Sequence, residues 1–221
     1  EYFSENVIRK SFMYNGKILE SGMPRNDILF QNDKETIVKK VISKYELWND
    51  SYIVLFAPTW RKNKKRSQCL DVSAIKKAIK IRFGKDAVVL GRGHHRESKM
   101  IETNIIDVTD YPDMQELLVA ADMLITDYSS SIWDYSFSGK PCFLFTPDLE
   151  EYSKTPGFDR SIYEWGFDVC CTTIELVNSI EKFDEEVYRE KMNLHHKELT
   201  SYERGNACKQ VCDYINEFRN I

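Results

Sequence analysis

From residue 52 onward, short apolar segments alternate with amphipathic ones, and few folds accommodate this alternation. Strands are predicted at residues 52–58, 87–90, 105–108, 123–126, 141–145 and 168–171. Helices are predicted at residues 71–83, 112–121, 129–138, 175–183, 185–199 and 203–218, with Pro112 in the first turn of the second helix. Apolar strands separated by helices form parallel sheets that are covered on both faces. We therefore expect an α/β fold, a Rossmann-like parallel sheet with helices on both faces.

Residues 1–50 do not share this alternation. Residues 21–27 (SGMPRND) predict a turn, and residues 33–47 predict an amphipathic helix capped by Asn32 or Asp33. Because the chain begins at Glu1 rather than Met, we expect it to be a piece of a longer protein. The first 50 residues are expected to link the Rossmann-like domain to a domain upstream.

The composition excludes several classes of protein. Basic and acidic residues number 31 and 35, so the net charge of −4 argues against a dedicated nucleic-acid binder. The six cysteines form no CxxC pair, which favours a reducing cytosolic setting over a disulfide scaffold. No apolar run approaches the roughly 18 residues that a membrane-spanning helix needs.

Three consecutive serines follow the fourth predicted strand, at the edge of the sheet where such folds bind ligands. Ser129, Ser130 and Ser131 open a predicted helix directly after Thr126-Asp127-Tyr128. Free N–H groups at a helix start attract phosphate, and serine hydroxyls add further donors. A single serine in this place often caps a helix without any ligand. The run of three favours phosphate binding.

A second group of candidates lies on the loops after the first two strands. The guanidinium groups of Arg92 and Arg96 suit a pyrophosphate, and His94 suits a proton carrier. Arg61 ends the first strand and is expected to point into the same crevice. The alternative for these residues is an ordinary surface loop.

Asp134 lies on the same predicted helix as the three serines, five residues after Ser129. One turn into a phosphate-binding helix, its carboxylate is placed to reach a ribose diol. The alternative is an acid that faces solvent.

Two pairs of residues in the C-terminal third are assigned to structure rather than chemistry. His195 and His196 lie in a highly charged predicted helix and are expected at the surface. Cys208 and Cys212, one helical turn apart, are expected to be core thiols rather than a redox site.

Several motifs recur in a familiar order. They are GMPRND (22–27), LFAPTWR (55–61), RGH (92–94), DVTDYPDMQELL (107–118), LITDYSSSIWDY (124–135), GKPCFLF (139–145), DLEEY (148–152) and GF (157–158). In order and spacing the chain resembles the CDP-glycerol glycerophosphotransferase family, the teichoic-acid primases and polymerases. That family has a GT-B architecture of two Rossmann-like domains. The resemblance implies that residues 1–50 are a linker and remnant of the acceptor domain, and that residues 51–221 are the C-terminal, donor-binding half with its C-terminal helices.

The resemblance also implies roles for single residues. The RxH pattern makes His94 and Arg92 catalytic, with His94 assisting the leaving nucleotide. The donor phosphates would be bound by Arg61, Ser129, Ser130 and Ser131. The nucleoside would be bound by Asp134, Tyr111, Pro112, Asp113 and Met114. Motif residues without an assigned role are Arg25, Asn26, Asp27, Asp127 and Glu151. The family's other key histidine, in a WHG-type motif of the N-terminal domain, has no counterpart here, so the chain alone is expected to be inactive.

The implied reaction transfers glycerol phosphate, or a related polyol phosphate, from a CDP-linked donor to a hydroxyl of a lipid-linked or cell-surface polymer. It releases CMP and belongs to teichoic acid or capsule biosynthesis. CDP-glycerol is the expected donor, and no cofactor or metal is expected to be obligatory because no DxD-type motif is present. The parent protein is expected to be cytoplasmic and peripheral on the inner membrane face, without nucleic-acid partners. Two alternatives stay open, a GT-B glycosyltransferase using a UDP- or CMP-sugar and a non-catalytic nucleotide-binding module.

Overall fold

The computed structural model describes residues 1–59, 70–93, 104–154 and 160–219. In these ranges one parallel sheet contains β1 (Tyr52–Phe56), β2 (Ala87–Gly91), β3 (Ile105–Asp107), β4 (Met123–Thr126), β5 (Cys142–Phe145) and β6 (Asp168–Cys170). The strand order is β3-β2-β1-β4-β5-β6, and Val54 of β1 pairs with Val89 on one side and Met123 on the other. The Rossmann-like fold class expected from the alternation is confirmed.

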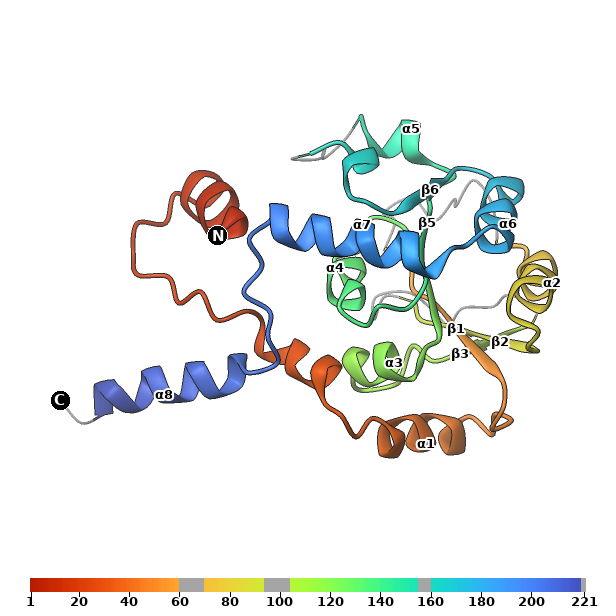
Figure 1. Cartoon of the computed structure of the whole chain (residues 1–221), viewed down its shortest axis with the longest axis horizontal. Helices are drawn as coiled ribbons and strands as arrows, with labels where there is room; N and C mark the ends of the chain where they lie inside the picture. The colour runs from red at the N-terminus through yellow and green to blue at the C-terminus, as the bar shows by residue number, and fades with distance from the viewer. Residues whose placement is uncertain (60–69, 94–103, 155–159, 220–221) are drawn as a thin grey trace.

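The centre of the sheet is apolar and fully covered. Every residue of β1, β4 and β5 is buried, which explains why these strands read as continuous apolar runs rather than alternating ones. Helices α2 (Val72–Phe83) and α6 (Thr173–Glu181) pack against each other on one face, while α3 (Met114–Ala120) and α4 (Ser131–Ser136) cover the other (Figure 1). The core therefore lies on both sides of the sheet and holds the strand ends in place.

Two helix starts differ from the sequence expectation. Helix α1 (Glu35–Lys44) has Lys34 at its N-cap and no side-chain cap, so the expected cap by Asn32 or Asp33 is wrong. Pro112 precedes α3 instead of lying in its first turn, because Asp113 accepts a hydrogen bond from the Gln115 N–H and starts the helix later.

The segments outside the sheet domain lie around its edges. The N-terminal part contains the π-helix η1 (Phe3–Ser11) and the 3-10 helix η2 (Pro24–Phe30). Helix η2 begins within residues 21–27, where the sequence predicts a turn. Beyond β5 follow α5 (Leu149–Tyr152), η3 (Ile162–Glu164), α7 (Glu185–Glu198) and α8 (Ala207–Arg219). Helix α8 packs against η2 and extends away from the sheet (Figure 1). In the part of the chain that the structure describes, no helix is long and apolar enough to cross a membrane.

Two assignments in the C-terminal third are corrected by the structure. His195 is 4% exposed and stacks on Trp133, so it belongs to the core rather than to the surface. Cys208 and Cys212 are exposed on α8 rather than buried in the core. Both errors come from judging burial by the composition of a helix. A charge-rich helix can still bury one face, and a helix with an apolar stripe can leave that stripe exposed to solvent.

Candidate functional site

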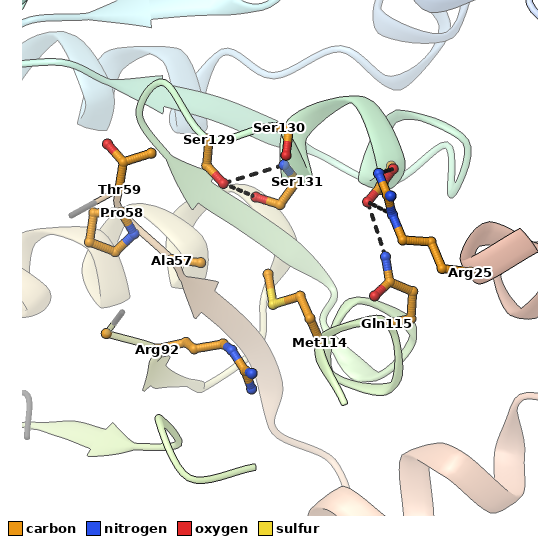
Figure 2. A pocket seen from close by; sticks show the side chains of 12 residues that line it. Arg25, Ala57, Pro58, Thr59, Arg92, Met114, Gln115, Ser129, Ser130 and Ser131 are labelled. Atoms are coloured by element: carbon orange, nitrogen blue, oxygen red, sulfur yellow. Dashed lines mark hydrogen bonds and ion pairs between the residues drawn. The ribbon is translucent and has the colours of Figure 1, made fainter. Parts of the chain in front are cut away.

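A pocket of about 540 Å³ opens at the carboxyl ends of the strands, where the strand order reverses between β1 and β4. Open α/β sheets bind their ligands at this switch point. The lining residues come from η2, three strand ends and the starts of α3 and α4, and they are Arg25, Ala57, Pro58, Thr59, Arg92, Gly93, Met114, Gln115, Ser129, Ser130, Ser131 and Asp134. Figure 2 shows these side chains around one opening. The pocket thus gathers residues from five of the motifs that the sequence singled out.

The three serines line the pocket together. The Ser129 hydroxyl accepts hydrogen bonds from the Ser131 N–H at 3.3 Å and the Ser131 hydroxyl at 2.9 Å. Ser130 occupies the N-cap position of α4, but its side chain makes no capping hydrogen bond. In this geometry Ser130 therefore does not act as an ordinary capping serine. Its exposed hydroxyl remains at the rim of the pocket.

Arg92 enters the pocket from the end of β2. One guanidinium nitrogen donates to the Tyr111 carbonyl at 2.7 Å, which fixes the side chain across the neighbouring loop. Burial lowers the pKa of Arg92, although an arginine in this position stays charged at neutral pH. A partly desolvated, fixed guanidinium suits a phosphate oxygen.

Asp134 lies in the pocket wall and is 6% exposed. Arg25 donates to both of its oxygens, Nε at 3.0 Å and Nη2 at 3.1 Å. Asn26 donates at 2.9 Å and Gln115 at 3.0 Å (Figure 2 draws the contacts of Arg25 and Gln115). Since a carboxylate offers about four acceptor sites, these four bonds saturate it. A ribose contact of Asp134, as expected from the sequence, would require that one of these bonds open.

Asn26 connects the pocket wall to the C-terminal segment. Its side chain is 1% exposed, and its Nδ2 donates to Glu203 at 3.0 Å as well as to Asp134. The Met23 N–H donates to the same Glu203 oxygen at 3.0 Å. Burial raises the pKa of Glu203, and in the described part of the chain its Oε2 has no hydrogen-bond partner.

Asp27 does not reach the pocket and acts instead as a helix cap. Its carboxylate accepts hydrogen bonds from the backbone N–H groups of Ala207 at 2.9 Å and Cys208 at 2.8 Å, at the start of α8. Together with the contacts of Arg25 and Asn26, this cap means that the PRND motif connects η2 to the sheet domain and to α8.

Asp127 joins the ends of β1 and β4. It accepts hydrogen bonds from the Thr59 N–H at 2.8 Å, the Thr59 hydroxyl at 3.0 Å and the Tyr128 N–H at 2.6 Å. The two loops that flank the switch point are therefore held together by one carboxylate. Glu151 lies on α5 and does not line this pocket.

The residues at 111–114, which were expected near the nucleoside, differ in whether they line the pocket. Met114 lines the pocket, whereas Tyr111 is buried and its hydroxyl donates to Glu116 at 2.5 Å. Pro112 and Asp113 precede α3 without lining the pocket. Their contact with a nucleoside stays a prediction.

Three candidate residues from the sequence lie outside the described residues: Arg61, His94 and Arg96. Conversely, sequence reasoning missed Gln115 as a pocket residue. The signal that could have found it is its place at the start of the helix that follows β3, at the edge of the sheet where such folds bind ligands. Within residues 1–59, 70–93, 104–154 and 160–219, no cluster of three His, Cys, Asp or Glu side chains is arranged to hold a metal ion.

Residues 1–217 match the family model described as CDP-Glycerol:Poly(glycerophosphate) glycerophosphotransferase. The chain is 27% identical to a teichoic acid poly(glycerol phosphate) polymerase of Bacillus spizizenii, over 96% of this chain and 57% of that protein. It is 27% identical to a teichoic acid glycerol-phosphate transferase of Staphylococcus aureus, over 96% and 58% of the two chains. The solved structure of the wall teichoic acid polymerase TagF superimposes with a TM-score of 0.78 and 27% identity, over 97% of this chain and 55% of that one. The chain thus spans little more than half the length of these relatives.

Proposed function

The chain belongs to the CDP-glycerol:poly(glycerophosphate) glycerophosphotransferase family, and we propose that it is the donor-binding half of an enzyme that transfers a polyol phosphate from a CDP-linked donor. In this proposal residues 51–221 bind the donor, and residues 1–50 connect them to an acceptor domain. The chain would thus supply the C-terminal half of a GT-B architecture. The supporting observation is the pocket at the switch point, into which Arg92 and three serines project from different strand ends.

The donor diphosphate is proposed to lie between Arg92 and the serine loop. The hydroxyl of Ser130 and the backbone around Ser129 and Ser131 donate hydrogen bonds, and Arg92 neutralises charge from the β2 side. The apolar side chain of Met114 lies in the wall along which the nucleoside is proposed to extend, and Tyr111, Pro112 and Asp113 directly precede it in the chain. Because the carboxylate of Asp134 already accepts four hydrogen bonds, we assign it no direct contact with the donor.

In the proposed reaction, the oxygen of an acceptor hydroxyl forms a bond to the β-phosphorus of the donor. The bond between that phosphorus and the oxygen bridging to CMP breaks, and CMP leaves with the electron pair. Arg92 and the serine hydroxyls stabilise the charge that develops on CMP. His94 and Arg61 keep their predicted roles at the leaving group and the phosphates. The acceptor proton passes to a base on the upstream domain.

Glycerol phosphate is the proposed cargo, because the polymerases of Bacillus spizizenii and Staphylococcus epidermidis that the chain resembles are named for poly(glycerol phosphate). Ribitol-phosphate enzymes are also among the relatives, so the polyol is part of the test. The proposed acceptor is a lipid-linked or growing teichoic acid, which places the parent protein at the inner membrane face.

The test is a turnover assay of the protein that contains this chain together with its upstream domain. We expect CMP release and a new phosphodiester with CDP-glycerol, and neither with a UDP-sugar. Arg92→Gln is expected to lower kcat/KM about 10²-fold, because one preorganised charge contact is lost from the transition state. The matched control is Arg189→Gln, which removes an exposed α7 guanidinium paired with Glu185 and should leave turnover unchanged. A glycosidic product from a UDP-sugar, or nucleotide binding without any transfer, would contradict the proposal.

A further inference from the structure

Gln115 lines the pocket although it is 8% exposed. It is the second residue of α3, and its N–H donates to the capping Asp113 carboxylate at 2.8 Å, so the backbone position is fixed. In Figure 2 its side chain lies on the same wall as Met114 and below the serine loop. Buried polar side chains are usually hydrogen-bonded, so an amide oxygen without a protein partner beside a cavity is available to a ligand.

Only one end of the Gln115 amide has such a partner. Its Nε2 donates to Asp134 Oδ2 at 3.0 Å and approaches Asn26 Oδ1 at 3.5 Å. In the described part of the chain, no hydrogen bond reaches its carbonyl oxygen Oε1. Figure 2 shows this oxygen on the side of the amide away from the dashed line that ends on Asp134.

The network fixes which way this amide points. An ionised carboxylate only accepts hydrogen bonds, so Asp134 must face the NH₂ end of Gln115. Asn26 is held in the same manner, because its Nδ2 donates to Asp134 at 2.9 Å and to Glu203 at 3.0 Å. A flip of Gln115 would place its oxygen against two acceptors, Asp134 Oδ2 and Asn26 Oδ1, and would remove one donor from each, which is unfavourable at a buried site. The pocket therefore presents a fixed hydrogen-bond acceptor beside the apolar Met114.

We propose that Gln115 is a specificity-determining residue whose Oε1 accepts a hydrogen bond from the exocyclic amino group of a cytosine base. This inference rests on the proposed function, since it assumes that a cytidine nucleotide occupies the pocket. Uracil carries a carbonyl oxygen where cytosine carries the amino group, so it would place an acceptor against an acceptor. The Met114 thioether packs against the ring, because a flexible, polarizable side chain adapts to an aromatic face.

In this account Asp134 is a positioning residue. It does not touch the donor but holds the Gln115 amide in the orientation that favours cytosine. Arg25 and Asn26 contribute by donating three hydrogen bonds that hold that carboxylate in place. The same contacts explain why Asp134 lines the pocket and yet has no acceptor site left for a ribose hydroxyl.

The test is isothermal titration of the 221-residue chain with CMP and with UMP, in the wild type and in Gln115→Met. We expect the wild type to prefer CMP. Gln115→Met should weaken CMP binding about tenfold and leave UMP binding equal or tighter, because one hydrogen bond to the base is lost and one repulsion is relieved. The control is Gln210→Met on α8, whose amide bonds Asn206 far from the pocket and whose loss should change neither affinity.

A second variant separates base recognition from folding. Asp134→Asn keeps the shape of the side chain but offers both a donor and an acceptor, so Gln115 can flip. We expect a reduced preference for CMP in a protein that still melts cooperatively.

Three results would overturn the inference. An unchanged CMP preference in Gln115→Met, in a chain that does prefer CMP, overturns the inference and leaves the proposed function standing. Equal weakening of CMP and UMP overturns the contact with the base. A wild-type chain that binds both nucleotides equally, or neither, overturns the inference together with the cytidine donor in the proposed function.

Discussion

Asp134 is the single side chain on which the pocket wall depends most. One buried carboxylate holds Arg25 and Asn26 of η2 and Gln115 of α3. Removing a buried charge partner leaves the remaining donors unsatisfied, which costs more than the pair itself contributes. We therefore expect that a substitution of Asp134 disturbs the contacts of all three residues together.

Replacing Asp134 by alanine should lower the free energy of unfolding by about 2–3 kcal/mol, below the cost of a fully buried pair because the Arg25 side chain is 50% exposed. Urea denaturation measures this. Asp213→Ala removes an exposed carboxylate that pairs with Lys209 and should cost less than about 0.5 kcal/mol. Equal losses in the two variants would contradict the role given to Asp134.

His195 makes folding stability depend on pH. Burial, and to a lesser degree Arg160, lowers the pKa of His195 to about 4 from its ordinary value of 6.5. The unfolded chain therefore binds a proton that the folded chain does not, and stability should rise as the pH rises from about 4 to 6.5. The contribution of this one group is on the order of 3 kcal/mol.

His195→Phe tests this dependence, since a phenyl ring can keep the stacking on Trp133, whose centroid lies 5.0 Å away. We expect the rise of unfolding free energy between about pH 4 and 6.5 to become shallower, without disappearing. His196 has its pKa lowered to about 4 in the same way and remains in the variant. Chemical denaturation at a series of pH values provides the measurement, and an identical slope in both proteins would refute the assignment.

Among the elements, α8 depends on a cap from a distant segment. Asp27 lies on η2, yet its carboxylate accepts the N–H groups of Ala207 and Cys208 at the start of α8. The helix projects from the sheet domain, so this cap and the packing on η2 determine its position (Figure 1).

Asp27→Ala should destabilise α8 by about 1 kcal/mol and speed amide hydrogen exchange along the helix, while exchange in β1 and β4 stays slow. Asp86→Ala is the control, because it removes an exposed carboxylate that pairs with Lys80 and makes no contact with α8. Faster amide exchange in the sheet, or no acceleration of amide exchange in α8, would show that the cap does not act locally.

The elements also show what local sequence can predict. The strands were predicted because β1, β4 and β5 are apolar throughout, a property of the sequence itself. The start of α1 was not predicted correctly, because no side chain caps this helix and its position follows from packing. Likewise the pocket serines were predictable from their place after a strand, whereas the role of Gln115 depends on Asp134, Arg25 and Asn26, which only the fold brings together.

For the molecule as a whole, we propose that protein donors rather than a metal ion neutralise the charge of the donor phosphates. We expect a chelator such as EDTA to leave the transfer rate of the parent enzyme unchanged, because Arg92 and the serine loop offset the phosphate charge. Complete loss of activity that Mg²⁺ restores would contradict this.

The central claim is that the pocket between β1 and β4 holds a CDP-linked donor. Its most direct test is a thermal-shift titration of this chain with CDP-glycerol, in the wild type, Ser130→Ala and the control Ser153→Ala on the exposed side of α5. A ligand that binds the folded state raises the melting temperature in proportion to the logarithm of its concentration. We predict a shift that grows with the logarithm of the CDP-glycerol concentration, that Ser130→Ala weakens and that Ser153→Ala retains. No shift in the wild type, or an equal shift in all three proteins, would contradict the claim.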